Sequence, residues 1–375
     1  MKKRTLPLLL FAALSVLLAS CNSEGEKRTI TFENISSVKD YAQSGTFQAA
    51  GSNVEVMPGQ EIQITFNAMK GQTLMFATMY GNSWDLFFAP QNPGIKLFES
   101  NGDPVTGDIS DQVKLWDAGT KKNNDPRRNK KGQPREDEDR QVTEINGKDG
   151  TYDYPPAGEM MKLNLAYDAA SSRFTLTMRN NTNATKVQTP FSTGVWAVSN
   201  AFDGKPVNEK PLFDAGQKAG TELIALAERG NNQPLGDKLA ANTGAFTALS
   251  PIIVVVYKGE RNPLATTIAN EMNTDTQDWA QSGNLDNLKK AMENNPDVKS
   301  VHTISSFTKP GETAETSYNA RQGEKVAFAA MMGHSSIIQN NTPVDALQRN
   351  NITSDISISG KDMLRAEQVV RVNIK

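Results

Sequence analysis

The chain has 375 residues, and its 40 basic and 42 acidic side chains give a formal net charge of −2 at neutral pH, so no nucleic-acid partner is expected. It contains two histidines, His302 and His334, and one cysteine, Cys21. So few of these residues offer little support for catalysis by histidine or thiol, and a single cysteine excludes an internal disulfide. About 355 residues remain beyond an N-terminal signal, which is enough for roughly two domains with proper cores.

Residues 1–20 have the pattern of a bacterial signal peptide. Cationic residues at 2–4 precede an apolar run at 6–18 that is short for a membrane span, and small residues lead to Cys21. The segment resembles a lipobox, in which Cys21 is lipidated and becomes the first residue of the mature protein. This predicts a lipid anchor in the bacterial outer membrane, facing the surface or the periplasm, with residues 21–27 as a tether. The alternative is an ordinary cleaved signal that happens to precede a cysteine.

An internal repeat is the most informative pattern beyond the signal. Residues 57–71 align with residues 309–323, an offset of 252, and the match continues without a gap to Ser83 and Ser335. Each copy has a Pro-Gly turn, an alternating strand, a second turn at glycine and a more apolar strand. Both copies are therefore predicted to form β-hairpins with one buried face.

Two further pairs of segments extend the repeat. The opening strands are predicted at 29–34 and 175–180, and the closing strands at 161–165 and 370–374. The pattern predicts an all-β fold with minor helices, made of two antiparallel β-sandwich domains at 28–168 and 171–375.

The second domain is expected to contain two strand-helix units that the first domain lacks. One has an apolar strand at 190–198 and a helix at 221–230, where a threonine cap begins the helix and Gly230 ends it. A looser copy has a strand at 250–257 and a helical pattern at 283–293.

Two aspartates in the stretch 81–122 are the best candidates for a site. Asp85 and Asp117 each follow a tryptophan in segments that otherwise have the composition of buried strands. A carboxylate at the end of a strand can reach into a loop, where it caps a turn or holds a cation.

The stretch resembles the second half of the spondin N-terminal domain, with its Ser-x-Asp-x-Phe segment and its Trp-Asp-Ala-Gly-Thr-Asp/Glu loop. The strand-helix units resemble the tandem units of bacterial spondin-domain proteins. The resemblance implies a calcium ion held by three aspartates, whose positions fall on Asp85, Asp117 and Lys121. Ile337 stands at the position of Asp85 in the second domain, so no second metal site is expected.

Lys121 places a cation where the third ligand should be. One hypothesis is that its ammonium group takes the place of the metal by pairing with Asp85 or Asp117. In the other, Lys121 points outward and a further aspartate supplies the missing charge for calcium. The candidates for that carboxylate are Asp103, Asp108 and Asp111.

The segment 121–140 is rich in charge, proline and glycine and is expected to be an exposed loop. Its basic residues could form a patch for polyanions or lipid headgroups. The alternative, a solvated loop whose acidic run at 136–139 offsets its basic end, is favoured because no aromatic residue lies among the charges.

The four tryptophans are expected to divide between core and surface. Trp84, Trp116 and Trp196 lie in apolar strands and are predicted to be core residues. Trp279 lies in the polar segment 275–282 and is predicted to be exposed, as the first candidate for carbohydrate contact.

These patterns predict a non-catalytic, lipid-anchored cell-surface protein that acts in adhesion or binds an extracellular glycan or protein. His334 is expected to be a polar loop residue, since no Gly-x-Ser-x-Gly motif or placed acid accompanies it. Two alternatives remain: an envelope glycan-processing enzyme that uses Asp85 and Asp117 as paired carboxylates, and a purely structural envelope lipoprotein.

Overall fold

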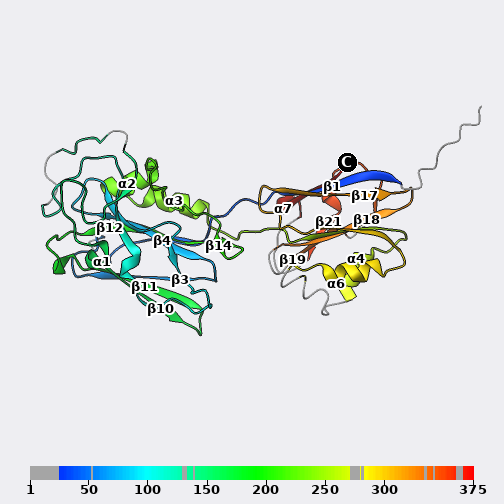
Figure 1. Ribbon diagram of the computed structural model, residues 1–375, viewed down its shortest axis with the longest axis horizontal. Helices are drawn as coiled ribbons and strands as arrows, with labels where there is room; N and C mark the ends of the chain where they lie inside the picture. The colour runs from blue at the N-terminus through cyan, green and yellow to red at the C-terminus, as the bar shows by residue number, and fades with distance from the viewer. Residues whose placement is uncertain are drawn as a thin grey trace, which may run out of the picture. The chain divides into compact units, whose positions relative to one another are not determined.

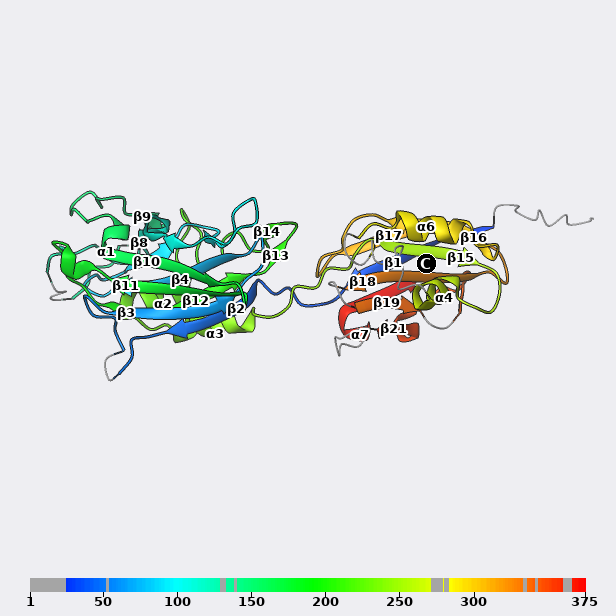
Figure 2. The ribbon, with the colours of Figure 1, turned by 90° about the horizontal axis from the view of Figure 1, so that it is seen from below.

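The computed structural model describes residues 25–51, 54–128, 133–137, 140–270, 279, 283–332, 336–340, 343–359 and 366–375. The predicted signal peptide, Cys21 and the tether before Gly25 lie outside the described residues, as does His334. Antiparallel strands dominate the described chain, and helices are few (Figures 1 and 2). The predicted class, all-β with minor helices, is confirmed.

The chain divides into two compact units. Unit 2 is continuous, Ser37–Thr247, whereas unit 1 combines Met1–Ser36 with Ala248–Lys375. Unit 2 is thus inserted into unit 1 after the first strand.

Unit 2 contains two sheets that enclose a common core. The larger sheet has the order β2-β12-β4-β5-β8-β9, and the smaller has the order β3-β11-β10-β7. The strands of the larger sheet are β2 (Tyr41–Phe47), β12 (Phe191–Ser199), β4 (Thr73–Tyr80), β5 (Leu86–Pro90), β8 (Val113–Asp117) and β9 (Thr143–Glu144). Those of the smaller sheet are β3 (Glu61–Asn67), β11 (Arg173–Asn180), β10 (Met161–Asp168) and β7 (Gly107–Asp108).

Short elements and two longer helices complete unit 2. They are β6 (Ile95–Lys96), η1 (Ser110–Gln112), α1 (Ala157–Met160), η2 (Thr182–Ala184), β13 (Ala201–Phe202), β14 (Lys205–Pro206), α2 (Thr221–Arg229) and α3 (Gln233–Ala241).

The sequence of each strand in unit 2 reflects how many of its faces are covered. In β3, buried and exposed residues alternate, as in a strand with one face on the core. Every residue of β4 is buried: Phe76 packs between the sheets, and Ala77 packs with Leu223 of α2 on the other face. The continuous apolar run of β4 is therefore explained by helices covering the outer face of its sheet.

Unit 1 is a sandwich of the same kind. One sheet has the order β16-β15-β18-β19-β21, and the other has the order β17-β1-β22. The strands of the larger sheet are β16 (Val298–Ile304), β15 (Ile252–Tyr257), β18 (Lys325–Met332), β19 (Ser336–Asn340) and β21 (Ile356–Ser359), and β20 (Val344–Asp345) pairs with β18. The smaller sheet contains β17 (Thr313–Ala320), β1 (Glu26–Asn34) and β22 (Val370–Ile374), and the helices are α4 (Pro263–Asn270), α6 (Asp286–Glu293), η3 (Thr353–Asp355) and α7 (Ala366–Val369).

Among the described residues, the eight strands along the two sheets of unit 1 have counterparts in unit 2, whereas β7 and β9 of unit 2 have none. The hairpin β3-β4 and the hairpin β17-β18 begin at the same sequence offset, 252, that the repeat predicts. Sheet order agrees as well: β2-β12-β4-β5-β8 corresponds to β16-β15-β18-β19-β21, and β3-β11-β10 corresponds to β17-β1-β22. The two units therefore share one arrangement of strands but follow it with different chain connections.

The predicted domain boundaries differ from the observed division. The opening strand β1 pairs with β17 and β22 of unit 1, and the second opening strand, β11, pairs with β3 and β10 of unit 2. The strand-helix units are divided in the same way, because β12 and α2 belong to unit 2 whereas β15 and α6 belong to unit 1. The two hairpins offer equivalent partner strands, so similarity between copies cannot tell which hairpin an opening strand joins.

Candidate functional site

Asp85 lies at the turn between β4 and β5 of unit 2. The Ser83 hydroxyl donates to the Tyr80 carbonyl at 2.7 Å and accepts the Leu86 N–H at 2.9 Å, which closes the turn tightly. The Asp85 carbonyl accepts the Ala118 N–H at 3.1 Å, so this residue is already aligned with the end of β8. Its side chain is 0% exposed.

One oxygen of Asp85 holds the loop that follows β8. Its Oδ2 accepts the N–H groups of Thr120 and Lys121, each at 2.8 Å, and lies 3.2 Å from the Thr120 hydroxyl. Its Oδ1 is buried without a hydrogen-bond partner. A buried carboxylate oxygen in that state costs free energy unless a proton or a cation completes it.

Asp117 holds the same loop from the end of β8. It is 2% exposed; its Oδ1 accepts the Gly119 N–H at 2.7 Å, and its Oδ2 accepts Nδ2 of Asn123 at 2.8 Å. Gly119 has φ +72°, and a Cβ there would lie 2.9 Å from the Gln141 carbonyl oxygen, so the close turn requires glycine. The Ala-Gly-Thr sequence thus lets two aspartates bind one loop.

Burial raises the cost of ionising both carboxylates, and the charge of Asp117 adds to that cost for Asp85. Burial first, and then the charge of Asp117, raise the pKa of Asp85 to about 7, although the N–H bonds from the loop oppose this shift. Burial also raises the pKa of Asp117, against hydrogen bonds from Gly119 and Asn123 and the charge of Arg140. The pair therefore resists carrying two negative charges unless a cation compensates them.

A third carboxylate approaches from helix α2. Glu228 Oε1 lies 2.8 Å from the Thr120 hydroxyl, whose oxygen also lies 3.2 Å from Asp85 Oδ2. A hydroxyl has a single proton and can donate to one of these carboxylates at a time. The contact with the other is favourable only if that carboxylate is protonated or its charge is compensated.

Two amide oxygens in the segment that follows this loop also lack partners. Asn123 Oδ1 and Asn124 Oδ1 are buried without hydrogen bonds, like Asp85 Oδ1. Their orientations are set by their amide nitrogens, because Nδ2 of Asn123 donates to Asp117 and Nδ2 of Asn124 donates to the Asn82 carbonyl at 2.9 Å. Carboxylate and amide oxygens without donors are the kind of ligand that calcium prefers.

Lys121 does not lie where the hypothesis that its ammonium group replaces the metal would place it. Its ammonium group pairs with Glu136 and lies 3.6 Å from Glu228 Oε1, while only its backbone N–H bonds to Asp85. The pKa of Lys121 is raised, chiefly by the hydrogen bond to Glu136. The ammonium group therefore does not replace the metal between Asp85 and Asp117.

The alternative carboxylates also lie elsewhere. Asp103 accepts Nδ2 of Asn101 at 2.7 Å, Asp108 accepts the Ser110 N–H at 2.8 Å, and Asp111 is exposed in η1. Within the described ranges, no group of three or more His, Cys, Asp or Glu residues is arranged to hold a metal. A cation here would depend on the asparagines, which the sequence analysis did not single out.

Thr120 and Glu228 also belong to this cluster, and the sequence motifs did not indicate a role for either residue. Asn123 and Asn124 follow the loop motif directly, so two consecutive amides after the second aspartate were the available signal. Glu228 had no such signal, because helix α2 was assigned to the other domain.

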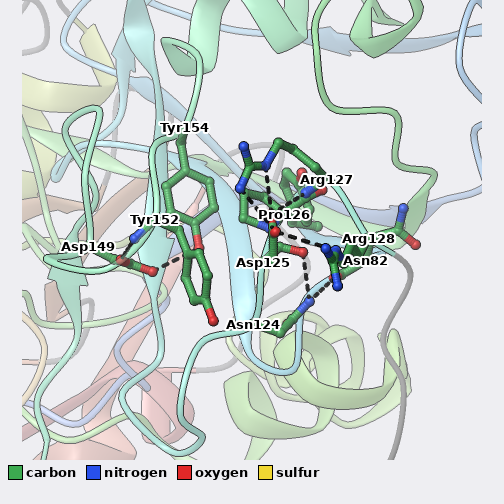
Figure 3. Close-up of polar contacts among 10 residues, drawn as sticks. Asn82, Asn124, Asp125, Pro126, Arg127, Arg128, Asp149, Tyr152 and Tyr154 are labelled. Atoms are coloured by element: carbon green, nitrogen blue, oxygen red, sulfur yellow. Dashed lines mark hydrogen bonds and ion pairs between the residues drawn. The ribbon is translucent and has the colours of Figure 1, made fainter.

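The charged segment contributes an ordered turn next to the cluster (Figure 3). Asp125 accepts two hydrogen bonds from the Arg127 guanidinium, at 2.9 and 3.0 Å, and the Tyr80 hydroxyl donates to the Pro126 carbonyl at 3.3 Å. The side chains of Arg127 and Arg128 are 65% and 83% exposed. Residues 129–132 and 138–139 of this segment lie outside the described residues.

The tryptophan predictions are confirmed in part. Trp116 is buried, whereas Trp84 and Trp196 are half-buried. Trp279 is 1% exposed and packs in the core of unit 1, so the prediction that it is exposed was wrong. Its Nε1 donates to the Pro251 carbonyl at 3.4 Å, which satisfies its one polar atom and makes burial favourable despite the polar local sequence.

Two residues of unit 1 bear on the remaining expectations. Ile337, at the position that the repeat aligns with Asp85, is half-buried against the apolar cluster beneath α6. His302 lies 3.0 Å from the Ser300 hydroxyl through Nε2, and burial lowers its pKa.

No protein-family model matches the chain, and neither a curated protein nor a solved structure matches it. The resemblance to the spondin domain thus remains a prediction from sequence motifs. Over the part of the chain that the structure describes, no helix is long and apolar enough to cross a membrane.

Proposed function

We propose that this chain is a non-catalytic, lipid-anchored protein of the bacterial outer membrane that binds an extracellular glycan or protein, in the manner of a spondin domain supported by calcium. The observation that carries the calcium part is the buried, unpartnered Oδ1 of Asp85, on the aspartate that shares one loop with Asp117 and Asn123. Calcium would neutralise the carboxylate pair and thereby fix the loop that Asp85 and Asp117 hold. Loops fixed on a rigid sandwich are a common means of recognition.

Calorimetric titration with calcium tests the site. We expect binding in the range of extracellular modules, about 10⁻⁴–10⁻³ M, and loss of binding in Asp85→Asn, which keeps the shape and removes the charge. Asp111→Asn is the matched control, because Asp111 is exposed in η1 and should leave the affinity unchanged. Absence of binding heat for the unaltered protein at calcium concentrations about tenfold above 10⁻³ M would rule out the site.

The anchor is tested separately. We expect a radiolabelled fatty acid to be incorporated into the protein in cells and to be lost completely in Cys21→Ser, because Cys21 is the only cysteine. Incorporation that persists in the variant would show that Cys21 is not the anchor.

A glycan-processing role is the second candidate, and one observation favours it. A carboxylate whose pKa is raised to about 7 has the property needed of a general acid in glycoside hydrolysis. Against it, Asp85 and Asp117 are 0% and 2% exposed, so a sugar ring could reach neither without opening the loop. Hydrolysis of a glycan panel that is lost in Asp117→Asn would favour the enzyme over the binding protein.

A further inference from the structure

We infer that one end of unit 1, the end where β1 begins, is a surface that contacts anionic lipid headgroups. This inference rests on the proposed lipid anchor at Cys21. It assigns a function to a surface that the calcium site does not involve.

The tether limits how far this end can lie from the membrane. β1 begins at Glu26, five residues after Cys21, and a fully extended chain spans at most about 3.6 Å per residue, or about 18 Å in all. β1 is also the central strand of its sheet, paired with β17 and β22. The anchor is therefore joined to the middle of a rigid sheet and not to a loose terminus.

Several loops of unit 1 meet at the same end. Glu26 pairs with Ala320, the last residue of β17, and the next strand begins at Lys325. Lys325 pairs with Asp345 of β20 and with Tyr257, the last residue of β15. The turns at 321–324, 258–262 and 346–350 thus gather around the start of β1, which runs the length of unit 1 in Figure 1.

Basic side chains outnumber acidic ones at this end when the residues that form ion pairs with each other are set aside. Three of its carboxylates are paired: Glu26 with Arg28 at 2.6 Å, Glu260 with Lys325 at 2.8 Å and Glu324 with Lys258 at 4.0 Å. Within the described part of the chain, exposed cations at this end that form no ion pair are Lys27, Arg261, Arg321 and Arg349. Of the acidic residues there, Asp297 and Asp345 are likewise outside ion pairs.

An excess of exposed cations near a bilayer favours anionic phosphate groups. Each Lys or Arg near such a surface contributes roughly fivefold in affinity at physiological salt, and the effect falls off within a Debye length of about 8 Å. The tether, at most about 18 Å long, keeps this end close enough to the membrane to come within that range, so the anchor and the charges can act together. The contact would hold unit 1 against the lipid and leave the opposite end of β1, at Asn34, as the point from which the chain continues into unit 2.

The test uses the mature chain with Cys21→Ser and no lipid, mixed with vesicles of phosphatidylcholine with or without phosphatidylglycerol. We expect sedimentation with the anionic vesicles alone, weakened by salt. The triple variant Lys27→Glu, Arg321→Glu, Arg349→Glu should lower the affinity by on the order of a hundredfold. The matched control, Lys70→Glu, Lys186→Glu, Lys205→Glu, changes the net charge equally at exposed positions of unit 2 and should retain most of the binding. Thermal unfolding verifies that both variants fold.

Three outcomes overturn the inference: no binding to anionic vesicles, equal loss in both triple variants, or binding to a soluble sulfated polysaccharide that is tighter than binding to the vesicles. A second measurement uses the lipidated protein, in which Cys21 is the only native cysteine and its thiol is blocked by lipid. A polarity-sensitive dye on Arg321→Cys should shift to the blue in vesicles, and the same dye on Lys186→Cys should not. Failure of lipidation itself is detected by the fatty-acid label and leaves the vesicle experiment interpretable.

Discussion

Asp85 has a hydrogen-bonding deficit that its own fold does not satisfy. Two backbone N–H groups bind one of its oxygens while the other oxygen has no partner, at full burial. A protein retains such a group only where a proton, an ion or a ligand compensates for it in one of its states. In the proposed calcium site a proton and the cation compete for Asp85, and in the calcium-free protein the pH determines whether Asp85 carries the proton.

This competition predicts how stability depends on pH when calcium is chelated. The pKa of Asp85 is raised to about 7 in the fold from an ordinary value near 4 when unfolded, so between these values the folded protein binds more protons. Stability should accordingly be highest near pH 4 to 5 and fall as the pH rises toward 7, by at most about 1.4 kcal/mol per pH unit. Denaturant unfolding in chelator at several pH values measures this slope.

Asp85→Asn separates the two roles of the carboxylate, which are to accept the N–H groups of the loop and to carry a negative charge. The amide oxygen can accept the same two N–H groups without a charge, so the variant should show a smaller decline, owing to Asp117, and be more stable than the parent protein at pH 7 in chelator. Calcium should stabilise the parent protein and leave the variant unchanged. An equal decline with pH in both proteins would assign it to other groups.

At the scale of elements, the sequence identified strands well and their partners poorly. The repeat predicted both hairpins because Pro-Gly turns and alternating residues are local signals, and β3 and β17 begin at the expected offset. The pairing of strands within a sheet joins residues that are far apart in the sequence, so local signals do not predict it. The segment of β1 resembles that of β11, and only register with β17 against β3 distinguishes them.

The site shows the same division between local and distant information. Asp85, Asp117 and Gly119 lie in short motifs, and the structure brings them together at one loop. Glu228 comes from helix α2, 108 residues from Thr120, and the predicted boundary near residue 170 placed it in the other domain. The prediction that Trp279 is exposed was wrong for a related reason, because its polar neighbours in the sequence do not indicate the apolar cluster that covers it in the fold.

On the scale of the whole molecule, the chain is one β-sandwich inserted into another. The ends of unit 2 lie together: the Gly244 N–H donates to the Tyr41 carbonyl at 2.9 Å, and Nδ2 of Asn200 donates to the carbonyls of Lys39 and Gly244. The flanking ends of unit 1 are also close, because Nδ2 of Asn34 and the Leu249 N–H both donate to the Thr308 carbonyl at 2.9 Å. Paired ends of this kind let each unit fold around its own core.

Excision of unit 2 tests this organisation against the boundary that the sequence suggested. A chain that joins residues 25–36 to residues 248–375 through a short glycine-serine linker should fold cooperatively as a monomer, and residues 37–247 alone should do the same. Residues 171–375 should not fold, because they lack β1, whose Ile30 and Phe32 are 0% and 1% exposed. Loss of these two side chains alone would cost about 5–10 kcal/mol, which is comparable with the whole 5–15 kcal/mol that stabilises a domain. Circular dichroism during thermal unfolding and the elution volume of each fragment measure the outcome. A cooperative transition in residues 171–375, together with aggregation of the joined chain, would show that β1 belongs with the first hairpin after all.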